Sequence, residues 1–363
     1  MKILIAGDVC PTSYTDPLFK KQDVDTLFGD VASIFEGNNI NLVNLECALG
    51  SELTPIKKIG PNLLACPETA QTLKKLGVNL CGISNNHFFD YGKRGAIESI
   101  SALKDAGIDY VGFGENYEDS RKNFVVEKNG EKVCFIAVCE HEFSYALDDR
   151  MGCRPFDPFD TIWDIRHAKE KCDRVIVIYH GGKEYSMYPS PRVRKAFHAM
   201  AKNGADVIIG QHSHCICCYE QVEGAHLLYG QGNFHFVSST PHTSEWYSAI
   251  EFKYDSLSNT VEFIPTVHSV GDLGITLAKG EKKESIIAEF NKRNESLLDG
   301  SWIDGWRDFV REKQDYYKKV IKRTYSWRST KDYEALFGHF LECESHADVW
   351  RELFPSANLT NEK

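Results

Sequence analysis

The feature that most constrains this fold is a short apolar run that ends in a polar turn carrying two histidines. Val207-Ile208-Ile209-Gly210 is followed directly by Gln211-His212-Ser213-His214. β-branched apolar residues before a glycine are typical of a buried parallel strand that ends in a tight turn. Side chains at the carboxyl end of such a strand face a crevice rather than the core. Because neutral imidazole is the commonest metal ligand, His212 and His214 are predicted to bind metal.

The same pattern recurs at four other places in the chain. Each is an apolar run with strand character that ends in an acid, an amide or an imidazole, and the side chains concerned are Asp8, Glu46, Asn86 with His87, and His180. In an open α/β sheet the carboxyl ends of the strands line one crevice. Residues that are far apart in sequence are therefore expected to share a site.

This set of side chains predicts a metal site. Two carboxylates, one amide oxygen and three ligating imidazoles are too many ligands for one tetrahedral ion, but they suit two ions bridged by a carboxylate. Oxygen and nitrogen ligands favour Mn, Fe, Zn or Mg over an iron–sulfur cluster. We therefore expect one or two divalent metal ions as cofactors.

Some of the same residues also have a purely structural interpretation. Asp8 could cap a helix or close a turn, and Asn85-Asn86-His87 could form an Asx turn. Glu140-His141-Glu142, after another strand, is interpreted as a polar loop. The repetition of polar groups at the same kind of location favours a functional role for the first two sets.

The order of helices and strands predicts an α/β fold. Helical spacing over 26–35, 68–77, 95–106, 162–171 and 191–203 alternates with strands up to about residue 220. Strand-rich sequence follows, with a hairpin-like pair at 249–254 and 261–267. It is expected to close a second sheet, which gives a sheet-on-sheet sandwich flanked by helices.

The composition changes after residue 281. Lys, Glu, Trp and Tyr become frequent, and long helical runs cover 284–297, 306–324 and 331–343. We expect two domains, 1–280 with the α/β sandwich and 281–363 as a C-terminal helical extension.

Composition also excludes some classes of partner. The chain has 363 residues and a formal net charge of -10, which argues against a nucleic acid or an anionic membrane. It starts directly in a strand pattern without an apolar signal segment, and no apolar run is long enough to span a bilayer. A cytoplasmic location and no membrane insertion are therefore expected. The oligomeric state is not indicated.

The twelve cysteines are scattered along the chain, so reduced thiols are expected. Cys215, Cys217 and Cys218 lack a second pair at finger-like spacing, which favours strand packing over a zinc knuckle.

A set of motifs in a fixed order carries a family resemblance. They are Gly7-Asp8-Val9, Asn44-Leu45-Glu46, Asn85-Asn86-His87 with Asp90 and Gly92, Leu103 to Ile108 with Gly112 and Gly114, His180 to Tyr185, Gly210 to His214, and Gly232-Asn233-Phe234. Over about residues 1 to 270 the chain resembles the CapA family of bacterial capsule and poly-gamma-glutamate synthesis proteins, which are related to metallophosphoesterases. The resemblance implies a metallophosphoesterase-like sandwich of two sheets flanked by helices. The C-terminal extension lies outside it.

The resemblance also implies roles for individual residues. Asp8 and His214 would hold one metal, Asn86, His180 and His212 the other, and Glu46 would bridge the two. A hydroxide between the ions would attack phosphorus in line, and His87 would stabilise the developing charge or protonate the leaving oxygen. Glu184 would orient a ligating histidine, and Asn233 would contact substrate or the second metal.

One position departs from the metallophosphoesterase pattern. The usual Asp-x-His is Asp8-Val9-Cys10 here, so one metal loses a histidine, and Cys10 is either a thiolate ligand or a buried inert thiol. The expected function is a metal-dependent hydrolase of phosphate esters, or of a related acyl or amide bond, in an anionic small molecule or polymer. The alternative is a catalytically silent binding or scaffold protein of capsule or poly-gamma-glutamate assembly. Lys58, Lys183 and Arg192 are candidates for neutralising an anionic substrate.

Overall fold

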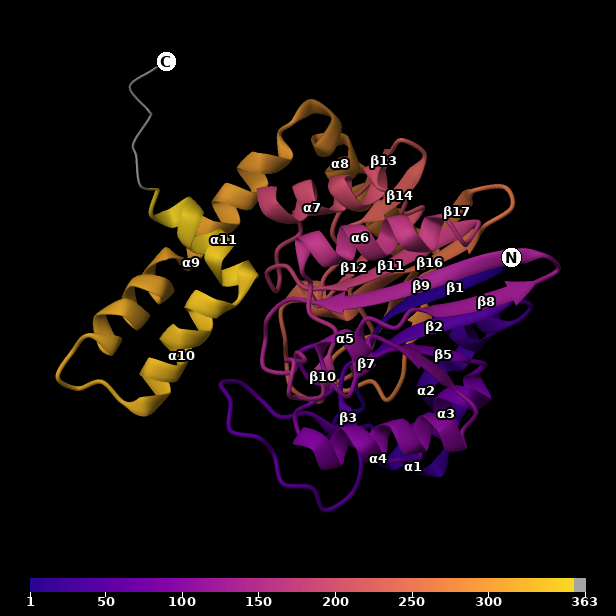
Figure 1. Ribbon diagram of the computed structural model, residues 1–363, viewed down its shortest axis with the longest axis horizontal. Coiled ribbons are helices and arrows are strands. Elements are labelled where there is room, and N and C mark those ends of the chain that lie inside the picture. Colours follow the sequence, from indigo (N-terminus) through magenta and orange to yellow (C-terminus); the bar gives the residue numbers. More distant parts are fainter. Residues whose placement is uncertain (356–363) are drawn as a thin grey trace.

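Two large β-sheets packed face to face form the centre of the molecule. The computed structural model describes residues 1–355. The first sheet has the strand order β18-β17-β16-β1-β2-β5-β6, with β15 also paired to β1, and the second has the order β13-β14-β12-β11-β9-β8. Helices cover both outer faces of this sandwich (Figure 1).

The strands have the following bounds. The first sheet contains β1 (Lys2–Val9), β2 (Ile40–Leu45), β5 (Leu80–Gly82), β6 (Asp109–Val111), β15 (Asn233–His235), β16 (Ser248–Asp255), β17 (Thr260–Val267) and β18 (Thr276–Leu277). The second contains β8 (Phe124–Lys128), β9 (Glu131–Cys139), β11 (Arg174–His180), β12 (Val207–Gln211), β13 (Tyr219–Val222) and β14 (Ala225–Leu228). Two small pairs are β3 (Ala48–Leu49) with β4 (Leu64–Ala65), and β7 (Phe113–Gly114) with β10 (Gly152–Cys153).

The helices are bounded as follows. The α-helices are α1 (Asp16–Lys21), α2 (Val24–Phe28), α3 (Thr69–Leu76), α4 (Gly92–Asp105), α5 (Tyr117–Ser120), α6 (Pro158–Lys169), α7 (Pro191–Lys202), α8 (Gly280–Asp299), α9 (Trp302–Thr324), α10 (Lys331–Glu342) and α11 (Glu344–Leu353). Two 3-10 helices are η1 (Gly29–Phe35) and η2 (Ser244–Tyr247).

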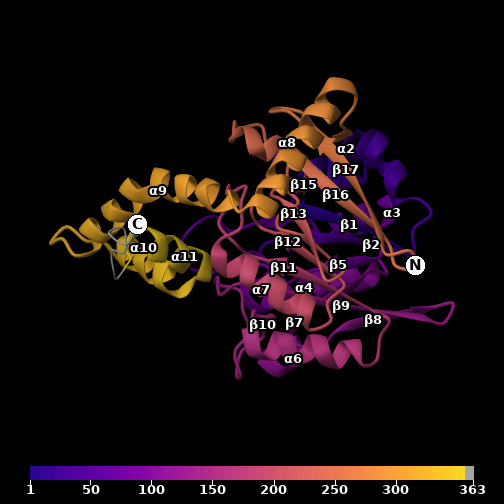
Figure 2. The ribbon, with the colours of Figure 1, turned by 90° about the horizontal axis from the view of Figure 1, so that it is seen from above.

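The central strands are apolar on both faces, as parallel strands covered on two sides must be. In β1, Ile3 and Ile5 enter the core between the two sheets, whereas Leu4 and Ala6 enter the core beneath α1 to α4. In β11, Ile176 and Ile178 face the same inter-sheet core. Figure 2 shows α6 and α7 on the outer side of the second sheet and α2 and α3 on the opposite side of the sandwich.

Local sequence signals explain where several helices begin and end. The Asp157 side chain accepts hydrogen bonds from the Phe159 and Asp160 amides and so caps α6, with Pro158 at the start of the helix. The Ser190 side chain caps α7 in the same way, before a proline. Gly77 ends α3 in a left-handed conformation with φ of 106°.

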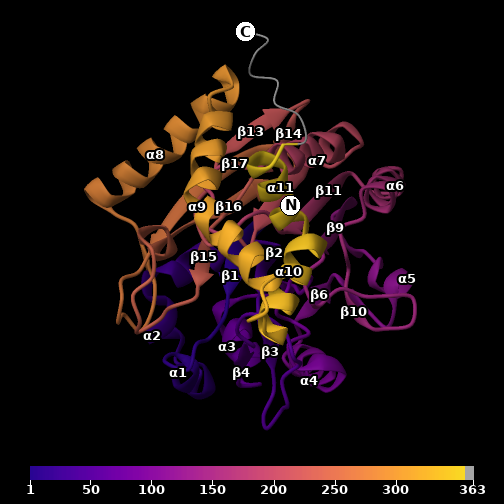
Figure 3. The same ribbon diagram turned by 90° about the vertical axis from the view of Figure 1, so that its left-hand side faces the viewer.

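The C-terminal helices lie in two places. Ile286 and Phe290 of α8 join the inter-sheet core at its edge. Helices α9, α10 and α11 pack on one another around Trp306, Tyr317 and Phe340. Figure 3 shows these three helices in front of the sandwich. The domain boundary at 280/281 stays a prediction, and the last residues of the predicted extension, 356–363, lie outside the described residues.

Within residues 1–355, none of the helices combines the length and the apolar character needed to cross a membrane.

The predicted fold class is confirmed: the chain is an α/β sandwich of two sheets flanked by helices, with further helices at its C-terminal end. The hairpin-like pair predicted at 249–254 and 261–267 is the antiparallel pair β16 and β17. The prediction missed α11, which begins directly after Cys343, the residue that also ends α10.

The expected origin of the second sheet is only partly right, because β13 and β14 complete it but the later strands do not. The strands after residue 230 do not build it, because β15 pairs in parallel and β16 in antiparallel fashion with β1 of the first sheet. The second sheet is made earlier in the chain, by strands between β8 and β14. The apolar pattern defines which residues are strands but not which strands pair, because pairing depends on contacts that are distant in sequence.

The helix predicted over 26–35 is also different. It is a short α-helix, α2, followed by the 3-10 helix η1. The break is at Gly29, which has φ of 45° and ψ of -127°, a conformation that stops an α-helix and that glycine tolerates. Leu27, Val31, Ile34 and Phe35 are nevertheless buried, as predicted.

A buried carboxyl in β16 makes the stability of this fold depend on pH. Glu251 is fully buried, and burial raises its pKa to about 8. Its oxygens accept hydrogen bonds from the Gly7 amide at 3.1 Å and the Thr266 hydroxyl at 2.9 Å. Folding therefore takes up a proton wherever the pH lies between the ordinary carboxyl pKa and that raised value, and stability falls as the pH rises through this window.

We predict that Glu251→Gln removes this dependence. The amide matches the protonated carboxyl, so the free energy of unfolding of the native protein should fall by roughly 2 kcal/mol more than that of the variant between about pH 6 and 8. Urea unfolding of both proteins at several pH values, with chelator present, measures the difference. Parallel pH profiles would contradict the prediction.

Candidate metal centre

The predicted ligands meet where the carboxyl ends of the two sheets lie side by side. β1 and β2 of the first sheet deliver Asp8 and Glu46, and β11 and β12 of the second deliver His180 and His212. Within each sheet, the register of the strands brings these side chains to the same edge. Asp8 pairs with Asn44 in β2, and His180 pairs with Gln211 in β12. We call the six side chains gathered here the sheet-end centre: Asp8, Glu46, Asn86, His180, His212 and His214.

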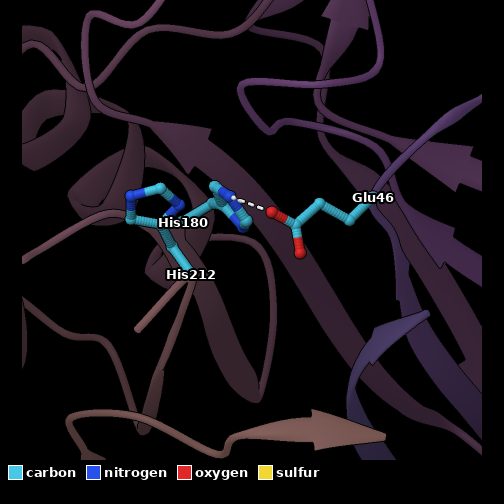
Figure 4. A group of neighbouring side chains, drawn as sticks. All are labelled: Glu46, His180 and His212. Atoms are coloured by element: carbon cyan, nitrogen blue, oxygen red, sulfur yellow. Dashed lines mark ion pairs between the residues drawn. The ribbon is translucent and has the colours of Figure 1, made fainter. Parts of the chain in front are cut away.

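Glu46 lies in the middle of this centre. It is fully buried, and neither of its side-chain oxygens has a hydrogen-bond partner in the described part of the chain. One oxygen lies 3.4 Å from His180 Nε2, as the dashed line in Figure 4 shows. A buried carboxylate without a donor costs several kcal/mol unless a cation compensates it.

One group of donor atoms surrounds Glu46 on the side of the second sheet. Donor atoms of Glu46, His180 and His212 lie within 4.8 Å of one another. Asn86 adds an amide oxygen 3.0 Å from His180 Nε2. Asn44 holds the other side of the His180 ring, with its Nδ2 atom 3.1 Å from Nδ1. This is the predicted grouping of Asn86, His180 and His212.

A second group lies on the side of the first sheet. Donor atoms of Asp8, Glu46 and His214 also lie within 4.8 Å of one another, so Glu46 is common to both groups. His214 Nδ1 is hydrogen-bonded to Asn233 Oδ1 at 2.9 Å and lies 3.9 Å from Asp8 Oδ2. Cys10 belongs to neither group. It is buried, and its thiol lies 3.8 Å from the carbonyl oxygen of the next residue.

Close packing of the strands brings Asn233 to this second group. β15 lies beside β1 in parallel, and Asn233 pairs with Asp8. A Cβ atom on Gly7 would lie only 2.3 Å from the carbonyl oxygen of Gly232, so only glycine allows the two strands to approach at this point.

The charges of the centre are poorly balanced without a cation. Burial, and then the nearby Glu46 charge, raises the pKa of Asp8 to about 6. Burial and the neighbouring His212 hold the pKa of His180 well below its ordinary value, so His180 is neutral and available as a ligand. Burial alone would lower the pKa of His214, but the Glu46 and Asp8 carboxylates raise it. A divalent cation would compensate both carboxylates.

The turn after β12 is strained. His212 has φ of 86° and His214 has φ of 53°, both in the left-handed region that non-glycine residues seldom occupy. Such strain persists only when the surrounding structure enforces it, and it is concentrated at functional sites. Here it turns both imidazoles of one short segment towards the sheet-end centre.

His87 lies next to the centre but belongs to neither donor group. Its Nδ1 is hydrogen-bonded to Asp90 Oδ2 at 2.7 Å. Lys58 forms an ion pair with the other Asp90 oxygen at 2.5 Å. Burial lowers the pKa of Lys58, an effect that Asp90 opposes. The result is a His–Asp pair with a buried lysine beside it, an arrangement suited to proton transfer.

A cavity of about 490 Å³ opens beside the centre. It is lined by side chains from three parts of the chain, among them Lys58, Asn86, His87, Glu142, Lys183, Glu184, Lys313, His339 and His346. The predicted orienting role of Glu184 stays a prediction, because this side chain makes no hydrogen bond to a histidine in the described residues. A different carboxylate, Glu142, lies 3.9 Å from His212 Nε2.

The structure thus brings most of the predicted site residues together. Of the three basic candidates, Lys58 and Lys183 line the cavity, whereas Arg192 pairs with Glu140 and with Asp348. All twelve cysteines are free thiols, and all but Cys172 are buried. The predicted cytoplasmic location stays a prediction.

Sequence reasoning missed the residues that the C-terminal helices add to the cavity, Lys313, His339 and His346. The signal that could have found two of them is the spacing of His339, Cys343 and His346, three metal-binding side chains within about two helical turns. Their neighbour Glu142 comes from the segment interpreted as a polar loop. It is 201 positions away from Cys343, and nothing in the sequence links the two segments.

Comparison with known proteins places the chain among relatives. The model of the family described as bacterial capsule synthesis protein PGA_cap matches residues 2–238. The chain is 28% identical over 254 residues to the capsule biosynthesis protein CapA of Bacillus anthracis, covering 68% of this chain and 62% of that protein. It is 28% identical over 295 residues to the PGA biosynthesis protein CapA of Bacillus subtilis (strain 168), covering 79% and 76%. The first alignment thus spans less than two thirds of the relative's length.

Among solved structures, a hypothetical protein from Thermus thermophilus aligns with a TM-score of 0.41 and 16% identity, covering 77% of this chain and 98% of that chain.

We predict opposite effects of Glu46→Gln on the protein with and without metal. Without metal the variant should be at least as stable as the native protein, because a buried charge without a donor is removed. With Mn²⁺ at about 100 times the dissociation constant, the native protein should gain about 2.7 kcal/mol and the variant much less. Thermal unfolding with chelator and with added metal measures both effects.

The matched control is Glu289→Gln, an exposed glutamate of α8. It should gain the same metal stabilisation as the native protein. Equal stabilisation of Glu46→Gln and the native protein by metal would contradict the prediction.

Proposed function

The chain belongs to the bacterial capsule synthesis protein (PGA_cap) family, and on this premise we propose that it is a metal-dependent hydrolase. The bond it cleaves is a phosphate ester or a related acyl or amide bond. The substrate is an anionic compound of capsule or poly-gamma-glutamate metabolism.

The observation that carries this proposal is the state of Glu46. Two groups of donors share this one carboxylate, and both of its oxygens are buried without a hydrogen-bond donor in the described residues. Oxygen and nitrogen donors around a shared carboxylate are the ligand set of a two-metal hydrolytic site. Asp8 and His214 would hold one ion, and Asn86, His180 and His212 the other.

The residues around the centre support hydrolysis. Bound divalent ions would supply a hydroxide near neutral pH and compensate charge on the substrate. His87 lines the cavity, and Asp90 fixes its ring from the Nδ1 side. In this arrangement His87 delivers a proton to the leaving oxygen or nitrogen, while Asp90 and Lys58 keep the ring in place.

The cavity supports a compact anionic substrate. A volume of about 490 Å³ is in the range of a small-molecule site. Lys183, in the loop after β11, and Lys313 of α9 both line it, and neither has an ion-pair partner among the described residues. The cavity therefore suits a small anionic molecule or the end of an acidic polymer.

One observation favours the alternative, a catalytically silent binding or scaffold protein. The donor group of Asp8, Glu46 and His214 has no second histidine, because Cys10 stands at that position with its thiol buried. If this group binds its ion weakly, the cavity binds an anionic chain end without turning it over.

We predict that His87→Ala lowers kcat by about 10²- to 10⁴-fold and leaves the metal content unchanged, because His87 transfers a proton but belongs to neither donor group. The purified protein is assayed with Mn²⁺ or Zn²⁺ on chromogenic phosphate monoesters and diesters and on a γ-glutamyl oligomer. Elemental analysis of the same samples gives the metal content.

His167→Ala is the control, an exposed histidine of α6, and should behave as the native protein does. If the native protein holds two metals per chain yet hydrolyses none of these compounds, while binding the oligomer, the silent alternative replaces hydrolysis.

A further inference from the structure

Another group of metal-binding side chains, separate from the sheet-end centre, lies between the sandwich and the C-terminal helices. It consists of Glu142, in the loop after β9, His339 of α10, and Cys343 between α10 and α11. We call these three residues the C-terminal cluster. His339 and Cys343 lie beyond residues 2–238, the part that the family model matches, so two of its three side chains come from outside the matched region.

Two of the three donor–donor distances in the cluster match the edge of a metal coordination tetrahedron. His339 Nε2 lies 3.3 Å from Glu142 Oε1, and Cys343 Sγ lies 3.3 Å from the same oxygen. All three donor atoms are within 4.8 Å of one another. Zinc binds imidazole, carboxylate and thiolate at about 2.0 to 2.3 Å, which places tetrahedral ligands roughly 3.3 to 3.8 Å apart.

Two of these donors, Glu142 and Cys343, are buried, and His339 is partly buried; outside the cluster, Cys343 Sγ also contacts the Ser345 hydroxyl at 3.2 Å. Cys343 is fully buried, and Glu142 is 7% exposed. No backbone amide, lysine or arginine donates to the Glu142 carboxylate within residues 1–355. A neighbouring group, Glu140 with Cys343 and Glu344, is different, because basic side chains already pair with both of its carboxylates.

The cluster faces the cavity. Glu142 and His339 both line it. Three protein ligands with the remaining position turned towards a cavity are the pattern of a zinc site that is open to water or substrate. His346 also lines the cavity, with its Nδ1 hydrogen-bonded to the Tyr317 hydroxyl at 2.5 Å.

We propose that the C-terminal cluster is a third metal site, which binds Zn²⁺ through Cys343, His339 and Glu142. On binding, the Cys343 thiol releases its proton to solvent and ligates as thiolate. The bound ion ties α10 to the loop after β9 and so fixes the C-terminal wall of the cavity. Because Glu142 Oε2 is 3.9 Å from His212 Nε2, the same carboxylate connects this site to the sheet-end centre.

The test is a titration of the full-length apoprotein with Co²⁺, an ion that binds at zinc sites. Bound Co²⁺ gives a strong thiolate charge-transfer absorption in the near ultraviolet only when a cysteine ligates it. Neither donor group of the sheet-end centre contains a cysteine, so this absorption reports the C-terminal cluster. We expect one thiolate-bound Co²⁺ per chain in the native protein and none in Cys343→Ser. Cys172→Ser, at a half-buried cysteine after α6, should keep the full signal.

Two further variants make the result decisive if Cys343→Ser does not fold. His339→Ala and Glu142→Gln should each weaken the affinity for Co²⁺, measured by the thiolate absorption, at least about tenfold. Replacing a residue that only orients a ligand already lowers metal affinity by about this factor, and these two residues are ligands themselves. Glu46→Gln should keep the signal, which separates this site from the proposed hydrolytic centre. No thiolate absorption in the native protein, or absorption that survives Cys343→Ser because Cys10 or another thiol binds, overturns the proposal.

Discussion

The burial of two carboxylates at the junction of two sheets is the constraint on which the rest of this structure depends. Asp8 and Glu46 are both fully buried and close enough for the charge of one to raise the pKa of the other. Such a pair is costly in a low-dielectric interior. It is tolerated because each residue lies at the end of a strand whose other side chains are packed on both faces. The Asn44 side chain and the His212 amide donate to Asp8, but no group within residues 1–355 donates to Glu46, so the fold holds Glu46 where a cation can compensate its charge.

The parts of the site at strand ends could be predicted from sequence, because the chemistry of a strand end is local. A run such as Ile208-Ile209-Gly210 indicates where the strand stops, and the next polar residue must lie at the sheet edge. Pairing is not local in this sense. The sequence pattern assigns the strands after about residue 220 to the second sheet, but β15 and β16 pair with β1 of the first sheet. An apolar alternation pattern fits either partner equally well.

The same limit explains why the C-terminal contribution was missed. Trp306, Tyr317 and Phe340 of α9 and α10 pack on one another, but their spacing in the sequence says nothing of what lies beneath them. The contact between Glu142 and Cys343 joins positions separated by 201 residues. A shared core with a variable wall is a common way to change what a site accepts, since the reacting groups stay in place while the wall changes.

The pairing of β15 and β16 with β1 has a consequence for how the molecule is made. During synthesis, β1 finds one of its edge partners only after residues up to Asp255 have left the ribosome. Until then β1 exposes an unpaired edge with apolar side chains on both faces, the kind of segment that associates wrongly with other chains. The first sheet therefore stays incomplete until β16 has been synthesised. A truncated nascent chain that ends before β16 is correspondingly a candidate for chaperone binding.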